Sequence, residues 1–186
     1  ELDVDLTPSR VASALPNGAT VAVIGWPDLA MESIHLRRDV SVRVIDAYGE
    51  GAGLARALMQ REVEVTEVPL TGLGQACATA DVVIIEAAAA GPEALIAPSG
   101  SYAAAICGLH AGKQTWVVVG AGRALPQRFF KVIEDELAKE NPLEADEEVV
   151  PMTVITHVVG PKGLTLSTDA MREDCGVAAE LLRPGL

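Results

Sequence analysis

The sequence predicts an α/β protein with a three-layer, Rossmann-like fold, in which a parallel sheet carries helices on both faces. Short apolar runs alternate with helical patterns of about ten residues along the 186-residue chain, the order typical of parallel βαβ units. Within the expected strand 81–85, the residues Val-Val-Ile-Ile are apolar on both faces, as a central strand covered by helices must be. Aromatic residues make up only 3% of the chain, so we expect a core of Val, Ile, Leu and Ala. We expect a single domain over residues 1–186, with 1–18 as a short helix and the entry to the first strand.

The strands are expected in short apolar runs bounded by turn residues. The run 20–25 ends in glycine, and the run 40–46 ends in an acid, Asp46. The run 63–68 is more polar, so we expect it near an edge of the sheet. The segment 86–100 contains glycine and proline and is expected to form a turn at the carboxyl end of the central strand. The further strands are expected at 81–85, 115–119, 149–155 and 156–159.

Helices are expected between these strands. The helix 127–140 is amphipathic, with Phe130, Ile133 and Leu137 on its apolar face, and Gly112 is expected to stop the helix before it. Polar residues at helix starts are expected to act as N-caps, because their side-chain oxygens can accept from free backbone N–H groups. These residues are Thr7, Asp28, Ser99 or Ser101, and Thr168 or Asp169. The expected helices are 7–15, 28–38, 49–61, 71–79, 101–111, 127–140 and 168–182.

Composition argues against several classes of function. The formal net charge is -12 and the longest cationic run is Arg37–Arg38, so no nucleic-acid partner is expected. No apolar run reaches the roughly 18 residues of a membrane span, and no signal peptide is visible, so no membrane association is expected. The cysteines have no metal-binding spacing, so we expect no metal, and we expect them as buried thiols of a cytoplasmic protein. They are Cys77, Cys107 and Cys175.

The glycine-rich segments do not complete a dinucleotide-binding fingerprint. Residues 120–122 (GAG) follow a strand, but Leu125 stands at the third glycine position of the G-x-G-x-x-G motif. Residues 25–27 (GWP) end the first strand without a glycine pair. Asp46 lies where NAD-binding proteins carry a ribose-binding acid, but it stands alone. We therefore expect no cofactor.

Glu86 is the strongest candidate for acid–base chemistry. It ends the central apolar strand, where partial burial is expected to raise the pKa of its carboxyl group. Two interpretations remain open: Glu86 acts in a functional site, or its carboxylate caps a helix N-terminus or pairs with an arginine. The histidines are not in a recognisable catalytic context; they are His35, His110 and His157.

Three turns are expected at one edge of the sheet, each leading into a helix, at 20–28, 48–53 and 98–101. Backbone N–H groups at such helix starts suit phosphate. None of the three turns contains Lys or Arg, whereas Arg123 and Lys131 follow a later strand. The sequence therefore gives phosphate binding at this edge little support.

The order and spacing of these motifs resemble the initiation factor 2B alpha/beta/delta family, which includes methylthioribose-1-phosphate isomerase and ribose-1,5-bisphosphate isomerase. In that family a helix and an Asp-Gly pair precede the first strand; here residues 10–18, which end in Asn17-Gly18, stand at that place. Residues 46–53 (DAYGEGAG) stand where the family has a Glu-(Ser/Thr)-Arg-Pro turn. Residues 97–101 (APSGS) stand where an Asn-Lys-Ile-Gly-Thr motif opens an Ala-rich helix. The resemblance spans about residues 10–163, covers only the family's C-terminal domain, and implies the fold shared with ribose-5-phosphate isomerase and CoA transferases.

The catalytic residues of the family's isomerases are not matched. The resemblance places their cysteine at 25–26 (GW), their aspartate at Ala88, their arginine at Tyr48 and their Asn-Lys pair at 97–98 (AP). A methyl group cannot transfer a proton, and the loss of one general acid or base costs about 10²–10⁴-fold in rate. We therefore expect no catalytic residue, with Glu86 as the only candidate.

The resemblance implies a non-catalytic initiation factor 2B-like protein, a homodimeric regulatory or scaffold domain with a degenerate pocket for a phosphorylated sugar or nucleotide-like molecule. The alternative is a sugar-phosphate or small-metabolite isomerase or sensor of altered specificity that uses Glu86. The chain begins with Glu1 rather than Met, and the family's N-terminal helical domain is expected to be missing from it. The residues expected to bind a ligand are Trp26, Asp46, Tyr48, Glu86, Ser99, Gly100 and Ser101.

Overall fold

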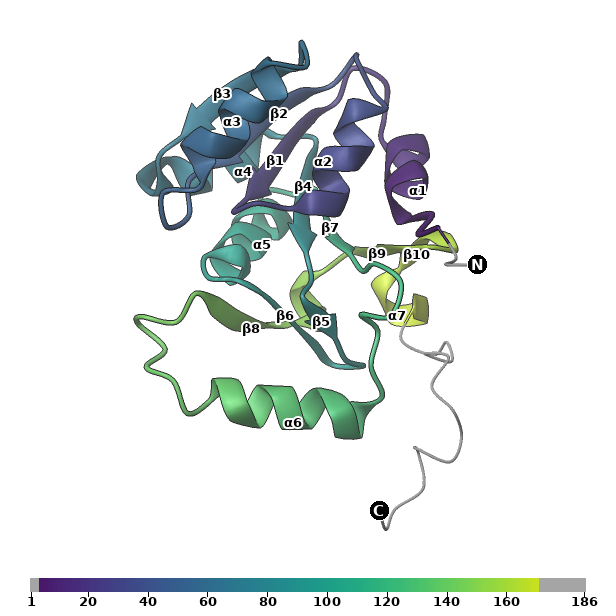
Figure 1. Ribbon diagram of the computed structural model, residues 1–186, viewed down its shortest axis with the longest axis vertical. Coiled ribbons are helices and arrows are strands. Elements are labelled where there is room, and N and C mark those ends of the chain that lie inside the picture. Colours follow the sequence, from purple (N-terminus) through teal and green to yellow (C-terminus); the bar gives the residue numbers. More distant parts are fainter. Residues whose placement is uncertain (1–3, 171–186) are drawn as a thin grey trace.

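The computed structural model describes residues 4–170, and its main feature is a seven-stranded sheet (Figure 1). Neighbouring strands are parallel except for the pair at one edge, which is antiparallel. The predicted α/β class is confirmed. In spatial order the strands are β10 (Gly163–Leu166), β9 (His157–Gly160), β7 (Gln114–Val118), β4 (Val82–Glu86), β1 (Thr20–Ile24), β2 (Ser41–Ile45) and β3 (Glu64–Val68).

Two strands occupy the positions that their composition predicted. β4 is the middle strand of the sheet, and its first four residues are all buried. β3 forms an edge, and none of its residues is buried. Side chains alternate between the two faces of the sheet along β4. Ile84 packs into the largest core cluster on one face, whereas Val83 and Ile85 point to the other face and pack into two further clusters. Burial on both faces is why this strand has no polar alternation.

Helices cover both faces of the sheet, which gives the three expected layers (Figure 1). On one face lie α1 (Thr7–Ala14), α2 (Asp28–His35) and α3 (Gly51–Met59); on the other lie a short 3-10 helix, η1 (Leu70–Gly72), α4 (Leu73–Thr79) and α5 (Ser101–His110).

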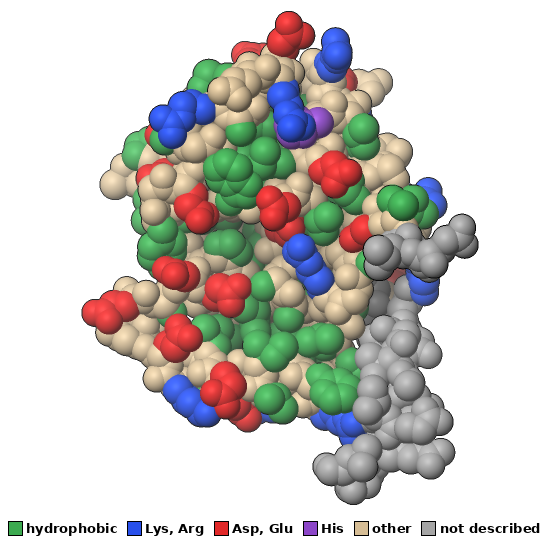
Figure 2. All heavy atoms as spheres, viewed as in Figure 1, with side chains coloured by type: hydrophobic (Ala, Val, Ile, Leu, Met, Phe, Trp, Pro, Cys, Tyr) green, Lys and Arg blue, Asp and Glu red, His purple; other side chains and the backbone are tan. Residues whose placement is uncertain are grey.

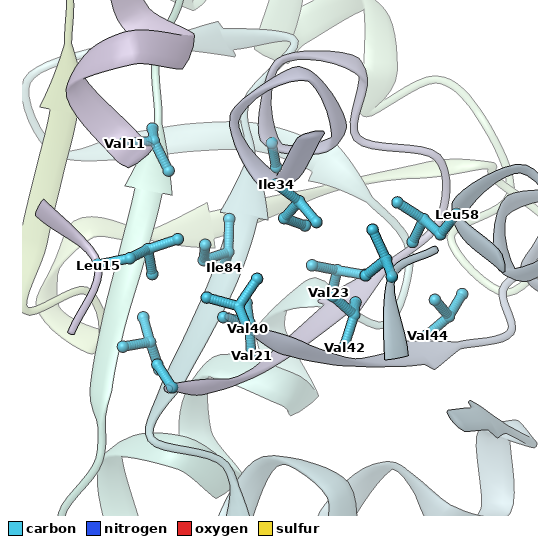
Figure 3. Packing of buried hydrophobic residues seen from close by; sticks show 14 of the residues in the cluster. Val11, Leu15, Val21, Val23, Ile34, Val40, Val42, Val44, Leu58 and Ile84 are labelled. Carbon is cyan, nitrogen blue, oxygen red and sulfur yellow. The ribbon is translucent and has the colours of Figure 1, made fainter. Parts of the chain in front are cut away.

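The largest core cluster lies between the sheet and the first set of helices. Figure 3 shows Val23 of β1 close to Ile34 of α2 and Leu58 of α3. Ile34 and Leu58 are fully buried. Removing a buried side chain of this size costs about 2–5 kcal/mol, so this interface fixes the positions of α2 and α3 against the strand ends.

A second sheet, three-stranded and antiparallel, lies beyond the carboxyl ends of the central strands (Figure 1). The expectation that 86–100 forms only a turn is wrong, because two of the three strands lie within it. The expected strand 149–155 is also corrected: the strand ends at Pro151, which has no N–H to donate, and a 3-10 helix follows it. The elements are β5 (Ala89–Ala90), β6 (Ala94–Pro98), β8 (Glu147–Pro151) and η2 (Met152–Val154).

Helix α6 (Gln127–Leu137) packs on this small sheet through Phe130. Phe130 is 1% exposed and shares a cluster with Ile96 of β6. Its ring excludes any side chain at Gly91, where a Cβ atom would lie 2.6 Å from the ring. Ile133 is 40% exposed, so the predicted apolar face of α6 is buried only in part.

The expected C-terminal helix and Cys175 lie partly or wholly outside the described residues. Of the helix expected at 168–182, only α7 (Ser167–Ala170) lies within them, and Cys175 lies outside them. Between residues 4 and 170, no helix is long and apolar enough to cross a membrane.

Candidate functional site

A surface pocket of about 390 Å³ lies at the carboxyl edge of the main sheet, where β1 and β4 end beside the small sheet. Figure 2 shows this face hollowed between the main sheet and the α6 layer, with acidic side chains gathered beside the hollow. Open α/β sheets bind their ligands at this edge. The pocket is lined by Ile24, Trp26, Pro27, Asp28, Glu86, Ala88, Pro98, Arg123 and Glu147.

Glu86, the last residue of β4, joins three segments of the chain at this pocket. Its Oε2 accepts hydrogen bonds from the backbone N–H groups of Leu29 (2.8 Å) and Ala30 (3.2 Å) in the first turn of α2. Its Oε1 accepts from Nη1 of Arg123 at 2.9 Å. The predicted cap and arginine pair are thus both confirmed. Burial raises the pKa of Glu86, although Arg123 and the two N–H groups act in the opposite direction.

Carboxylates of the chain itself occupy three helix starts at this edge. Glu86 occupies the start of α2, as described above. Asp46 Oδ1 accepts from the N–H of Gly51 at 2.8 Å, at the start of α3. Glu148 Oε1 accepts from the N–H of Tyr102 at 2.8 Å, at the start of α5. These N–H groups are the ones that would hold a phosphate, so an incoming anion meets negative charge at each of them.

The residues expected to cap these helices do not do so. Asp28 makes no cap hydrogen bond at α2, and neither serine makes one at α5. Ser99 Oγ instead donates to the carbonyl oxygen of Ala145 at 2.6 Å. Ser101 Oγ is buried and has no hydrogen-bond partner within residues 4–170. The caps come from carboxylates distant in the sequence, which a local pattern cannot reveal.

The turn after β7 is fixed against the same edge by one ion pair and by a hydrogen bond to a carboxylate. Arg123 Nη1 donates to Glu86 and also to the carbonyl oxygen of Ala87, at 2.9 Å. Asp5 Oδ2 accepts from the N–H of Ala121 at 2.9 Å, while its Oδ1 accepts from both the N–H and the hydroxyl of Thr7. Although partial burial opposes it, the hydrogen bonds from Thr7 and Ala121 and the charge of Arg123 lower the pKa of Asp5. Asp5, rather than Thr7, therefore satisfies the start of α1.

The residues expected to bind a ligand separate into two groups. Trp26 and Glu86 line the pocket, whereas Asp46, Ser99 and Ser101 have the roles described above. Tyr48 is not among the lining residues, and its hydroxyl donates to the carbonyl oxygen of Ala145 at 2.7 Å.

Gly100 supports the pocket wall rather than lining it. It has a φ of 97°, and a Cβ atom there would lie 2.7 Å from Cδ1 of Ile24, a lining residue. The glycine therefore allows α5 to begin close to the end of β1.

Sequence reasoning missed Asp28, Arg123 and Glu147 as pocket residues. The sequence places Arg123 after a later strand than the three predicted turns, but that strand, β7, is the neighbour of β4. The turns after these two strands therefore meet. Glu147 reaches the pocket through β8, which belongs to the unexpected second sheet. An explicit strand order could have found Arg123; no local signal pointed to Glu147.

No histidine or cysteine of residues 4–170 is among the residues that line the pocket. His157 packs beside Trp116 with 6.3 Å between ring centroids, and His35 Nδ1 lies 2.6 Å from Arg61. Burial raises the pKa of Cys77 to about 12, and Cys107 is half-buried rather than fully buried as expected. Between residues 4 and 170, no group of three His, Cys, Asp or Glu side chains could hold a metal ion.

The sheet order, the layers and the pocket define a Rossmann-like α/β fold with a surface pocket at the ends of β1 and β4. No protein-family model and no curated protein matches the sequence. Among solved structures, the fold is shared with eIF2B beta from Chaetomium thermophilum, at 16% identity and a TM-score of 0.69 over 87% of this chain and 51% of that chain.

Two further solved structures have the same fold. One is the Pyrococcus horikoshii OT3 translation initiation factor eIF-2B, at 15% identity and a TM-score of 0.72, covering 89% of this chain and 65% of that chain. The other is the tetrameric eIF2B-beta2-delta2 complex from C. thermophilum, at 21% identity and a TM-score of 0.73, covering 84% of this chain and 55% of that chain. This chain therefore has the eIF2B-like fold that its motifs suggested, and it spans between 51% and 65% of these chains.

Proposed function

We propose that this protein is a non-catalytic eIF2B-like domain that self-associates and serves a regulatory or scaffold role, with a degenerate sugar-phosphate pocket. The observation that carries the proposal is the occupation of three helix starts by Glu86, Asp46 and Glu148. Internal carboxylates accept from two N–H groups at the start of α2 and from one each at the starts of α3 and α5, and they place negative charge where a phosphate would otherwise bind. Of the pocket's charged side chains only Arg123 is cationic, and it is already paired with Glu86.

The residues at the former catalytic positions support the absence of isomerase chemistry. Ala88 lines the pocket where the resemblance places the isomerases' aspartate, and its methyl group can neither donate nor accept a proton. Pro98, at the position of the Asn-Lys pair, also lines the pocket and carries no charge. An isomerase of this kind needs a positioned acid or base to transfer the proton and a cation to hold the phosphate. Without both, the reaction loses proton transfer and the stabilisation of negative charge.

Self-association is supported by an apolar stripe on α5 and by one of the related structures. Tyr102, Ile106 and Leu109 lie three or four residues apart on one side of this helix and are each about 40% exposed. Helix α5 contains no Asp, Glu, Lys or Arg, in a chain with a net charge of -12. The similar chain from C. thermophilum comes from a tetrameric complex. We propose that α5 contributes to a homodimer contact.

The free cysteines and the net charge bear on where the protein works and on what it binds. Cys77 and Cys107 are free thiols, which a reducing compartment such as the cytoplasm would maintain. The net charge of -12 disfavours a phosphate backbone, so direct nucleic-acid binding is not part of the proposal.

Turnover and binding of the family's substrates test the catalytic part of the proposal. Ribose 1,5-bisphosphate and methylthioribose 1-phosphate should be neither isomerised nor able to raise the Tm, because the pocket lacks a free anion site. Isomerisation of either sugar phosphate would overturn the proposal.

Sedimentation of matched variants tests self-association. Ile106→Glu on α5 is expected to convert dimer to monomer, because it places a charge in the apolar stripe. Ile133→Glu on α6, at a side chain of the same exposure, is expected to leave the dimer intact. A wild-type monomer at all concentrations would refute the homodimer.

One observation favours a second candidate, a small-metabolite isomerase or sensor that uses Glu86. Glu86 has a raised pKa and lines the pocket, which are properties of acids that transfer protons. If a ligand or reaction is found, Glu86→Gln should abolish it. Unchanged activity in that variant would exclude this candidate.

A further inference from the structure

We propose that the pocket at the ends of β1 and β4 binds a small organic cation of the amine class. The proposal rests on the proposed function in one respect, that the pocket no longer serves a sugar phosphate. It assigns a ligand class to a site that the loss of isomerase residues would otherwise leave without one.

The charges that remain unpaired in the pocket are negative. Asp28 and Glu147 both line it and are exposed to solvent, and neither carboxylate makes a hydrogen bond or ion pair with any residue from 4 to 170. The third carboxylate, Glu86, is already neutralised by Arg123 and by the start of α2. The two unpaired carboxylates attract a bound cation, whereas they repel a bound anion.

An aromatic surface in the same pocket favours an organic cation over a hydrated ion. Trp26 lines the pocket with its side chain 42% exposed, although tryptophan usually lies largely buried. Its ring packs on Gly53, where a Cβ atom would lie 3.0 Å from Cζ3, so the absence of a side chain at Gly53 makes room for the indole. The face of an indole attracts ammonium groups, and it also covers the methylene groups beside them.

The arrangement does not suit a metal ion. In the described part of the chain, no three carboxylate, histidine or cysteine side chains converge closely enough to coordinate one. Asp28 comes from the start of α2, which packs on the main sheet, and Glu147 from the start of β8 in the small sheet, so the two carboxylates reach the pocket from different elements. An extended molecule with two ammonium groups can reach both carboxylates, and a volume of about 390 Å³ accommodates a ligand of that size.

Titration with 1,4-diaminobutane tests the inference, with 1,4-butanediol as the uncharged control of equal length. The probe should bind saturably and change tryptophan fluorescence, because Trp26 is exposed whereas Trp116 is 1% exposed. The double variant Asp28→Asn/Glu147→Gln should bind about tenfold more weakly, as expected for the loss of two partly exposed ion pairs. Trp26→Leu, followed by calorimetry, should weaken binding about two- to fivefold.

The matched control is Glu64→Gln/Glu67→Gln on the exposed edge strand β3, which changes the net charge by the same amount away from the pocket. It should bind as the wild type does. Absence of saturable binding, equal weakening in both double variants, or equal binding of the diol would overturn the inference. Turnover of a sugar phosphate would instead overturn the proposed function, so the two failures are distinguishable.

Discussion

Glu86 and Arg123 form a 2.9 Å ion pair that joins the end of the central strand to the turn after its neighbour β7. The Glu86 side chain is 9% exposed and the Arg123 side chain 34% exposed, so the two partners have unequal access to water. The same carboxylate holds the first turn of α2. Removing one partner should therefore not be equivalent to removing the other.

Arg123→Met should destabilise the protein by about 2–3 kcal/mol. The substitution leaves the buried Glu86 carboxylate without its cation, which costs about 3–5 kcal/mol in fully buried pairs and less here because the guanidinium is one-third exposed. Glu86→Gln should change the free energy of unfolding by less than about 1 kcal/mol, because the neutral amide avoids the burial cost and keeps an oxygen for α2. Urea denaturation of both single variants and the double variant measures the asymmetry. Equal losses in the two single variants would contradict it.

The pH dependence of stability should reflect the raised pKa of Glu86. A carboxyl group with a raised pKa keeps its proton in the folded state at pH values where the unfolded chain has lost it. Its contribution is therefore fully present below the ordinary value of 4.5 and is lost as the pH rises through the raised value. Glu86→Gln should remove this decrease. The measurement is the free energy of unfolding between about pH 4 and pH 8, compared with the wild type.

Asp5→Asn should change the acidic side of the same pH profile, where the free energy of unfolding falls as the pH falls. The pKa of Asp5 is lowered, so its contribution is present above the ordinary value of 3.8 and is lost as the pH falls through the lowered value. The amide keeps an oxygen for Thr7, but its nitrogen cannot accept from the N–H of Ala121 as Oδ2 does, so the variant should lose about 1 kcal/mol at neutral pH and show a shallower decrease in acid. Asp146→Asn, at an exposed carboxylate, is the control. An unchanged acid limb in Asp5→Asn would show that Asp5 does not tie α1 to the turn after β7.

Gly100→Ala should cost more stability than Gly49→Ala. Both glycines have a positive φ, 97° and 82°, which costs an alanine about 1–3 kcal/mol. At Gly49 the added Cβ atom meets nothing within 4 Å, whereas at Gly100 it lies 2.7 Å from Cδ1 of Ile24. The difference between the two variants in urea denaturation therefore measures the close approach of α5 to β1. Equal losses would mean that Ile24 moves aside freely.

The main sheet could be predicted because its signals are local. Residues 82–85 carry no polar side chain and belong in the middle of a covered sheet, while 64–68 (EVTEV) belongs at an edge. The second sheet gives no such signal. Its strand β5 consists of two alanines, and β6 ends in Pro98, so the glycine and proline around them dominate the pattern.

The chemistry of the pocket was predictable only where a residue's own position carried the signal. Glu86 could be identified because an acid at the end of an apolar strand is unusual, and its two partners followed as alternatives. Its contact with Leu29, however, joins residues 57 apart, and the contact of Glu148 with Tyr102 joins residues 46 apart. Such caps depend on the tertiary arrangement, so the sequence suggested Asp28, Ser99 and Ser101 instead.

Salt should stabilise this protein beyond the effect of an uncharged solute. The net charge of -12 destabilises the compact state by self-repulsion, and acidic side chains lie near one another on the face that carries the pocket (Figure 2). Screening lengths are about 30 Å at 0.01 M and about 3 Å at 1 M, so added salt suppresses repulsion between separate carboxylates. Each kcal/mol gained should raise the Tm by about 2–4 °C for a chain of this size. The measurement is the Tm in sodium chloride from about 0.01 to about 1 M. Sucrose at about the same molar concentrations is the uncharged comparison. A Tm that stays constant in salt, or that rises equally with sucrose, would show that the acidic side chains are far enough apart for their repulsion not to limit stability.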